Sequence, residues 1–552
     1  MSFVKNDNQQ LTVLDSTFNL TEREKRMLEK SWAKTFADKV FPAIDENIFS
    51  VLYSEKASRP NTPVNVIVGA LILKEALNVT DDEIVEAMAF DILYQYALHT
   101  TSFEEQPISD RTLSRFRARV LSYETENDVD LIHECVVKMA KEISDFMDIT
   151  PDKQRMDSLM VAANIRNLSL LELFYTCVAN LCKIMDERGT KIPDEQHHYV
   201  EKDDYNKCIY HKRDMDATER NVVVMKDADI LIKICDSTGD FDDTSEYQLL
   251  IRLLKERTII DDDGLRRLQP KEKVENPSEV LLNPSDPEAT FRYKAGGRHL
   301  GYVGNVVEAV GEKSSLVIVY DYQQNTYADN QFMKDYLNEK KDFSDGSFIV
   351  ADGAYSGEEN SRLASEHNLK LVTTNFTGRK PDEIYADFVF TDDGKYLIKC
   401  KNNRVPEDCI YDPGNERSVA YFRISDCEGC PYKERCQSRF LKTRVRKEVS
   451  WKSVGRAKQL QYMQTEEFSE YAKFRNGVEA IPSLLRRRYH VDKIPVHGKK
   501  RTRLFFGFKI AALDFQKLLD YKKALYFPKS WSIESRRPAR SPISFVAERN
   551  RL

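Results

Sequence analysis

The chain has 552 residues, of which 41% are hydrophobic and 10% aromatic, a composition that supports folded cores and excludes a disordered polypeptide. No apolar run reaches membrane-spanning length, and the amino-terminal MSFVKNDNQQ lacks an apolar signal core, so we expect a cytoplasmic protein with no membrane partner. The glycines form no phosphate-binding loop, so no nucleotide cofactor is expected.

Charge is distributed unevenly along the chain. The formal net charge of −6 by itself argues against a nucleic-acid partner. From Gln437 to Ile510, however, there are 19 Lys and Arg against six Asp and Glu, so this stretch carries +13 and the remainder −19. Such asymmetry indicates a surface that binds a polyanion, although a solvated basic surface on an ordinary enzyme explains it equally well.

The first part of the chain predicts an amino-terminal extension (1–55) and then a helical domain (56–125). VNVIVGALILKEALNV and TDDEIVEAMAFDILYQYAL carry apolar residues at helical spacing, and Thr80 is the expected N-cap of the second helix. A basic helix, RTLSRFRARVL, is suited to DNA contact through Arg111, Arg115, Arg117 and Arg119. Packing of an amphipathic helix with extended arginines is an equally good interpretation. Residues 126–150 are expected to be a linker.

Residues 151–530 predict an α/β catalytic domain with two insertions. Asp157 lies in RMDSLMVAANIRN, and a helical block follows at about 164–280. After the turn-rich NPSDPEAT, four strands are predicted in GYVGNVVEAV, SSLVIVYDY, SFIVADGAY and LKLVTTNF. Asp352 ends the third of these strands and precedes a predicted helix, SGEENSRLASEHN. This order of elements implies a mixed sheet with the helical block inserted into it.

A second insertion, at about 387–440, is rich in cysteine. Ten cysteines in a chain of this length do not indicate a disulfide scaffold, whereas CEGCPYKERC has the spacing of metal ligands. Thiolates in a reducing compartment favour structural zinc. The predicted ligands are Cys427, Cys430 and Cys436, with Cys400 as the fourth and Cys409 as the alternative.

Glu479 lies in AKFRNGVEAIPSLLRR, on a predicted helix that also carries Arg475 four residues earlier and Arg486 seven residues later. Gly477 and Pro482 flank the acid, so this helix is expected to start near Asn476 or to bend. Beyond it, residues 531–552 form a basic tail.

The three acids Asp157, Asp352 and Glu479 lie in sequence settings suited to metal binding. Asp321 in VIVYDY also ends an apolar strand, but Asp352 has the better motif, and we interpret Asp321 as a turn residue. A carboxylate at the end of a buried strand is held rigidly with its oxygens toward a cleft. Three such carboxylates can bind two divalent metal ions about 3.5–4 Å apart, an arrangement that breaks and makes phosphodiester bonds. An all-carboxylate site favours Mg²⁺, with Mn²⁺ as the alternative.

These motifs together resemble DDE transposases of bacterial insertion sequences, in particular the family numbered 1182. SDRTLSRFRAR resembles the end of the InsH-like amino-terminal domain, and MDSLMVAANIRN, ADGAYSGEEN and RNGVEAIPSLLRR resemble the three acid motifs. NPSDPEA with GGRHLGYVGNVVEAV, and Cys400 with CEGCPYKERC, complete the likeness from about Arg59 to Leu518. The resemblance implies a ribonuclease-H-like catalytic domain behind an all-helical amino-terminal domain.

The resemblance also implies roles. Asp157, Asp352 and Glu479 would hold the metals, and the enzyme would cleave double-stranded DNA at the transposon ends and join the 3′-hydroxyl to target DNA. Related transposases carry a Y-x2-R-x3-E-x6-K signature, in which Arg475, Glu479 and Arg486 fit the last three positions. The Tyr position is Ala472, with Tyr471 one residue away, and DGAY replaces a DAGY-like form. A homodimer on DNA and a bacterial, nucleoid-associated location follow from the same resemblance.

Two other functions use the same residues. A ribonuclease-H-like nuclease or resolvase would share the acids but would not need a helical domain to recognise DNA ends, which residues 60–121 supply. A catalytically silent DNA-binding protein descended from a transposase would not need to keep all three acids.

Overall fold

The structure is a computed structural model that describes residues 1–6, 15, 17–56, 58–100, 108–211, 216–294, 296–339, 343–376 and 379–526. The described chain divides into two compact units. The first unit draws its residues from Met1–Pro151, Ser158–Ala328 and Ile481–Leu552, and the second from Asp152–Asp157 and Asp329–Ala480. The expected basic tail, 531–552, lies outside the described residues.

The amino-terminal region of the first unit is helical, as predicted. Thr80 begins α4 with a capping box in which its side chain and that of Glu83 satisfy each other's backbone N–H groups. The stretch expected as a linker instead contains a 16-residue helix, α7, because its apolar residues recur at helical spacing and are buried. The helices here are α1 (Glu22–Glu29), α2 (Trp32–Thr35), α3 (Val64–Leu77), α4 (Asp81–Phe90), α5 (Ile92–Ala97), α6 (Asp110–Asn127) and α7 (Leu131–Phe146), with a π-helix at Phe36–Val40 and a 3₁₀ helix at Glu46–Leu52.

The predicted helical insertion has a hydrophobic core of its own. Its long helices are α8 (Leu170–Glu187), α10 (Ala217–Thr238) and α11 (Ser245–Arg257), and α8 lies against both of the others. Fully buried residues from all three, such as Phe174, Leu231 and Leu250, meet in this core. Shorter elements join them, namely η3 (His197–Val200), α9 (Asp204–Asn206), η4 (Lys207–His211), β2 (Thr258–Ile260), β3 (Arg266–Leu268) and η5 (Lys271–Lys273).

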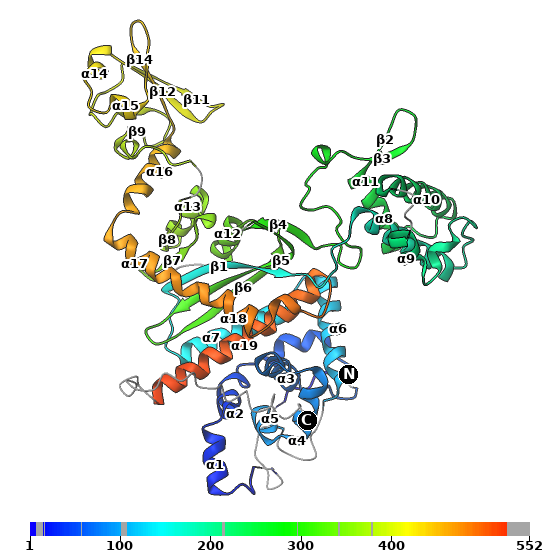
Figure 1. Ribbon diagram of the computed structural model, residues 1–552. Helices are drawn as coiled ribbons and strands as arrows, with labels where there is room; N and C mark the ends of the chain where they lie inside the picture. The colour runs from blue at the N-terminus through cyan, green and yellow to red at the C-terminus, as the bar shows by residue number, and fades with distance from the viewer. Residues whose placement is uncertain are drawn as a thin grey trace. The chain divides into compact units, whose positions relative to one another are not determined.

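Three antiparallel strands and a long helix complete the first unit. β5 (Gly297–Val310) pairs with β4 (Thr290–Lys294) and with β6 (Ser315–Gln324). The 28-residue helix α19 (Lys499–Tyr526) lies against α3, α7 and β6 (Figure 1). A short 3₁₀ helix, Val491–Lys493, precedes it.

The second unit contains parallel strands. β1 (Lys153–Ala162) has residues in both units, and its first residues pair in parallel with β7 (Phe348–Ala351), which pairs in parallel with β8 (Lys370–Thr373). Parallel and antiparallel pairs together make the mixed sheet expected from the sequence. The helices of this part are α12 (Asp329–Glu339), α13 (Glu358–Glu366), α16 (Trp451–Tyr462) and α17 (Glu466–Arg475), with 3₁₀ helices η6 (Gly353–Tyr355), η7 (Glu383–Asp387) and η8 (Asn476–Glu479); α18 (Ala480–Arg487) follows.

The cysteine-bearing stretch of the second unit forms small antiparallel sheets. β12 (Arg417–Phe422) pairs with β11 (Asp408–Asp412) and β14 (Val445–Val449), and β14 pairs with β13 (Arg439–Phe440). β9 (Val389–Phe390) and β10 (Leu397–Lys399) make a second pair, and α14 (Ile424–Glu428) and α15 (Lys433–Cys436) lie between β12 and β13 in the chain. In the described residues, every helix is too short or too polar to cross a bilayer.

Candidate active site

Asp157 and Asp352 occupy equivalent positions on neighbouring parallel strands. In the register between β1 and β7, Lys153 pairs with Phe348 and Arg155 with Val350, and the same offset carried two residues further sets Asp157 opposite Asp352. Neighbouring strands lie about 4.8 Å apart, and paired residues of parallel strands point to the same face. Both carboxylates are half-buried. The pairing of β1 with β7 therefore brings the first two predicted acids together at one edge.

Asp352 is oriented by the chain that surrounds it. It is the N-cap of η6, and its Oδ1 accepts a hydrogen bond of 2.6 Å from the Gly353 backbone N–H. The same oxygen accepts one of 2.7 Å from Nδ2 of Asn375, which follows β8. The turn after β7 thus fixes the carboxylate, and the next strand supplies an amide beside it.

Glu479 lies at a break in the helix, as expected from its neighbours. α17 ends at Arg475, η8 covers Asn476–Glu479, and α18 begins at Ala480. Arg475 connects the first and third acids: its Nη1 lies 3.4 Å from Oε1 of Glu479, and its Nη2 lies 4.0 Å from Oδ1 of Asp157. The Arg475 side chain is only 13% exposed, whereas that of Glu479 is 64% exposed. The Nε–H of Arg475 is buried and has no hydrogen-bond acceptor in the described part of the chain.

Arg155, two residues before Asp157, holds α17 against this edge. Its Nη1 donates a 2.9 Å hydrogen bond to the carbonyl of Phe474, and its guanidinium carbon lies 5.1 Å from the centre of the Phe474 ring. A Cβ at Gly477 would lie 1.7 Å from the same Nη1, so a larger residue there would displace the Arg155 guanidinium. Phe348 of β7 also packs against α17, with Tyr471 and Phe474 rings 4.8 and 5.2 Å away. Tyr471, near the signature's Tyr position, is therefore used in packing.

A cavity of about 820 Å³ opens beside Asp352. Its wall includes Ser356 and Gly357, which follow η6, and Phe376, which follows Asn375. Aromatic and cationic side chains of α16 complete it, and Arg456 lies 4.8 Å from the Phe376 ring. These α16 residues are Trp451, Lys452, Arg456, Lys458 and Tyr462. The wall is thus suited to a ligand that is both flat and anionic.

In the described part of the chain, the three carboxylates are not gathered around a single point. Within the described ranges, they do not present three oxygens within 4.8 Å of one another, as a one-ion site would. Two ions about 3.5–4 Å apart need a wider set of ligands. Carboxylate and amide oxygens are the donors present, and they suit Mg²⁺.

Two family models match parts of the chain. Residues 400–519, which include Arg475 and Glu479, match a transposase DDE domain, and residues 25–119 match a transposase domain (DUF772). This chain belongs to the DDE transposases of the insertion-sequence type. A DDE domain implies a ribonuclease-H-like fold and metal-dependent chemistry, and the mixed sheet agrees with that fold. No curated protein and no solved structure matches the chain.

The arginines of α6 in the amino-terminal part of the transposase are used in two ways. Arg117 pairs with Asp81 of α4 and lies 5.6 Å from the Phe505 ring, and Arg119 lies 5.4 Å from the Tyr53 ring. Arg111 and Arg115 are exposed. Packing therefore engages two of the four predicted DNA contacts and leaves two on the surface.

Arg486 belongs to the first unit and contacts two other residues of that unit. Its Nε lies 3.2 Å from Oδ2 of Asp492, and its Nη2 donates a 3.0 Å hydrogen bond to the carbonyl of Met160 in β1. The side chain remains 44% exposed, so these contacts leave part of the guanidinium accessible.

In the second insertion, four of the five cysteines lie close enough to affect one another's pKa values. Burial, and after it the charges of three neighbouring cysteines, raises the pKa of the Cys427 thiol to about 11. Those neighbours are Cys436, Cys400 and Cys430. Cys409 has a different environment, because its Sγ lies 2.9 Å from Oγ of Ser418 and accepts from the Leu397 N–H. The described sulfurs do not come within 4.8 Å of one another as a group of three.

Three residues of the transposase site were not found from the sequence. Asn375 follows β8 as Asp352 follows β7, so its place after a predicted strand was a usable signal. Arg155 and Gly477 gave no such signal, because their contact joins segments that are far apart in the chain.

Proposed function

We propose that this transposase binds the terminal inverted repeats of an insertion sequence, cleaves the DNA at its ends and joins the 3′-hydroxyl to target DNA. Asp157, Asp352 and Glu479 would hold two Mg²⁺ (or Mn²⁺) ions. The finer resemblance, to the family numbered 1182, is part of this proposal, as are a homodimer on DNA and a cytoplasmic, nucleoid-associated location in a bacterium.

The shared register of Asp157 and Asp352 on parallel strands carries the proposal. It supports two carboxylates on one face, one strand spacing apart. The Arg475 contacts to Asp157 and Glu479 support the third acid as a member of the same group. Asp157, Asp352 and the Arg475–Glu479 pair come from three separate segments, so a purely local reason for the proximity of these segments is excluded.

Each residue has a distinct task in this mechanism. When bound, the two ions would lower the pKa of an attacking water and stabilise charge on the leaving oxygen. Asp157 and Asp352 bind and orient them, and Asn375 with the Gly353 N–H fixes the Asp352 carboxylate. Arg475 holds Asp157 and Glu479 in place through its Nη atoms.

DNA would be bound at more than one surface. Exposed Arg111 and Arg115 would contact the transposon end, with Arg117 and Arg119 supporting the helix, while Arg475 and Arg486 would contact phosphates nearer the cleaved bond. Phosphate contacts position DNA, whereas base contacts supply specificity, so end recognition needs a surface separate from the catalytic one.

The test is the substitution Asp157→Asn or Asp352→Asn, which keeps the size of the side chain and removes its charge. Cleavage of a terminal-repeat substrate should be lost, while binding measured by fluorescence titration should be retained. Wild-type cleavage by either variant would contradict the metal role. If the wild-type enzyme cut DNA but never joined a 3′-end to a target, a nuclease or resolvase would explain the site instead.

We further propose that Cys400, Cys427, Cys430 and Cys436 bind one structural zinc ion. The electrostatic interactions among these four thiols support them as the zinc ligands. The hydrogen bond between Cys409 and Ser418 supports Cys400, rather than Cys409, as the fourth ligand. Cys430→Ser should release one zinc per chain and lower the melting temperature, whereas Cys409→Ser should keep the metal. Equal zinc in both variants and the wild type would exclude this ligand set.

A further inference from the structure

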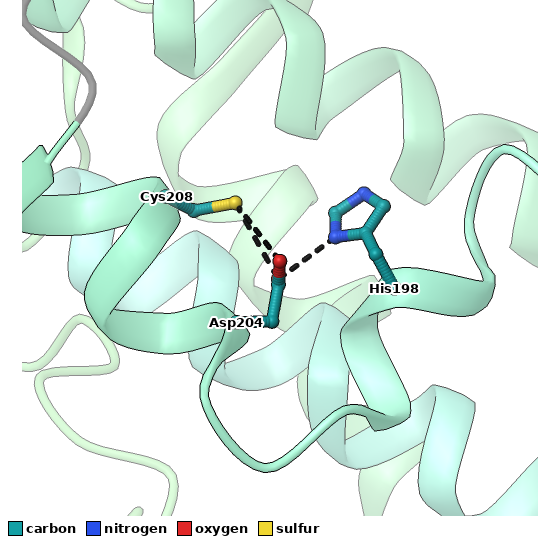
Figure 2. Close-up of side chains that lie close together, drawn as sticks. All are labelled: His198, Asp204 and Cys208. Carbon is teal, nitrogen blue, oxygen red and sulfur yellow. Dashed lines mark hydrogen bonds and ion pairs between the residues drawn. The ribbon is translucent and has the colours of Figure 1, made fainter.

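The helical insertion contains a second, different group of metal-binding side chains. His198, Asp204 and Cys208 each offer one ligand atom, and these atoms lie within 4.8 Å of one another (Figure 2). They come from η3, α9 and η4, three short elements that follow one another in the chain. Neither the DDE chemistry nor the cysteine-bearing insertion uses them.

The spacing of the ligand atoms is close to that of a tetrahedral zinc site. Nδ1 of His198 lies 2.8 Å from Oδ2 of Asp204, and Sγ of Cys208 lies 3.4 and 3.5 Å from the two Asp204 oxygens. Zinc bonds of about 2.0–2.3 Å at tetrahedral angles separate neighbouring ligand atoms by about 3.3–3.6 Å. The Sγ distances already fall in that range, whereas the Nδ1–Oδ2 pair would have to open by about 0.5 Å to admit an ion.

The Asp204 carboxylate is buried and lacks a strong cationic partner. Its side chain is 7% exposed, and in the described part of the chain no Lys or Arg pairs with it. Tyr175 of α8 donates a 2.5 Å hydrogen bond to Oδ2 of Asp204, as an outer partner of a metal ligand commonly does. Tyr175, His198 and Cys208 donate to this carboxylate, and a metal ion in place of the His198 and Cys208 protons would balance its charge as well.

The site is also accessible from one side. The His198 side chain is 35% exposed, so an ion and a water molecule can reach the group there. Asp204 and Cys208 are four residues apart and lie on one face of a helical turn, which directs both ligands toward His198 (Figure 2).

We propose that His198, Asp204 and Cys208 bind one Zn²⁺ ion, with water as the fourth ligand. Imidazole, carboxylate and thiolate are all common zinc ligands, and thiolate disfavours Mg²⁺ and Ca²⁺. The ion fastens the short elements between Gln196 and His211 to α8 through Tyr175. It is thus a structural clamp within the insertion, separate from the catalytic ions.

The experiment measures zinc in the full-length protein whose other proposed zinc site has been removed by Cys427→Ser and Cys430→Ser. After dialysis against Zn²⁺ and removal of excess metal, one zinc per chain should remain. Adding Cys208→Ser, which keeps a hydrogen-bond donor to Asp204 but removes the thiolate, should eliminate it. Tyr175→Phe should weaken zinc affinity about 10–100-fold.

Asp227 provides the matched control. It is a buried carboxylate of the same insertion that accepts hydrogen bonds from Tyr199 and Gln196. Asp204→Asn should therefore lose the ion, and Asp227→Asn should retain it. If the Cys427/Cys430 variant does not fold, the same comparison is made in the wild-type background, where Cys208→Ser should contain one zinc fewer per chain. Unchanged zinc in Cys208→Ser and Asp204→Asn would show a hydrogen-bonded cluster only and overturn the proposal.

Discussion

Helices α6 and α17 both carry arginines that the sequence offers to DNA, but the two helices place them differently. On α6, Arg117 is paired with Asp81, while Arg111 and Arg115 face solvent. On α17, Arg475 is largely buried and contacts two acids of the candidate active site. An arginine near acids that would bind metal is positioned for catalysis, and one paired with an acid in the first turn of a helix is positioned for stability. All of these arginines carry the same charge, so the acid that each one contacts decides whether it serves stability or the candidate active site.

The largest effect is expected at Arg475. Arg475→Ala removes the group that contacts Asp157 and Glu479, and loss of one charged donor at a reacting phosphate costs about 10²–10³-fold in rate. Single-turnover cleavage should fall by that factor, with end binding changed little. Arg475→Lys should recover part of the loss, because it keeps the charge but not the forked geometry. A wild-type rate for Arg475→Ala would assign the residue to packing.

The next effect concerns the fit of α17 against β1. Gly477→Ala places a methyl group on Arg155, and overpacking of this kind costs about 1–3 kcal/mol. Urea unfolding should show this loss, and cleavage should decline with it. Gly455→Ala in α16 is the control, since its Cβ would meet nothing within 4 Å. Equal stability of the two variants would mean that Arg155 moves aside at little cost.

A smaller effect is expected at Arg117. Burial raises the pKa of Asp81, but the hydrogen bonds and charges of Arg117 and, after it, Lys74 outweigh burial, so the pKa lies below its usual value. Arg117→Ala should therefore cost about 1 kcal/mol of stability at neutral pH. The difference between variant and wild type should be present above about pH 4 and shrink as the pH falls through the lowered pKa of Asp81. A pH-independent difference would point to the Phe505 contact instead.

The double variant Arg111→Ala with Arg115→Ala is expected to change stability least. Its clearest effect should be on the salt dependence of DNA binding. Exposed substitutions usually change stability by less than about 0.5 kcal/mol. Each lost phosphate contact should reduce the slope of log K against log salt by about 0.9, so the pair should reduce it by about 1.8. Titrations at several salt concentrations measure this, with Arg117→Ala as the comparison. An unchanged slope for the pair would remove α6 from the DNA surface.

The sequence predicted the elements far better than their contacts. Strands β1, β5, β6, β7 and β8 and the capped helix α4 follow from local patterns, since burial and N-capping are encoded within a few residues. The helix α7 had the same kind of signal in LIHECVVKMAKEISDF and was nevertheless expected as a linker. Here the pattern was present and was overlooked.

The candidate site was predictable only in part. Asp157, Asp352 and Glu479 were identified from their neighbourhoods, but the register that sets the first two opposite each other depends on pairing across the whole helical insertion. Which arginines of α6 face solvent depends partly on the pairing of Arg117 with Asp81 of another helix. The group of His198, Asp204 and Cys208 depends on the folding of three short elements, whose sequence has no distinctive ligand spacing. Long-range pairing is not encoded in any local window.

The contact between Arg155 and Gly477 also restricts how this sequence can evolve. The guanidinium occupies the space that any side chain at 477 would need. A lineage that acquires a larger residue at 477 gains stability from a smaller residue than arginine at 155, because that change removes the clash. Among homologous chains the two positions should covary, with glycine at 477 wherever arginine is kept at 155.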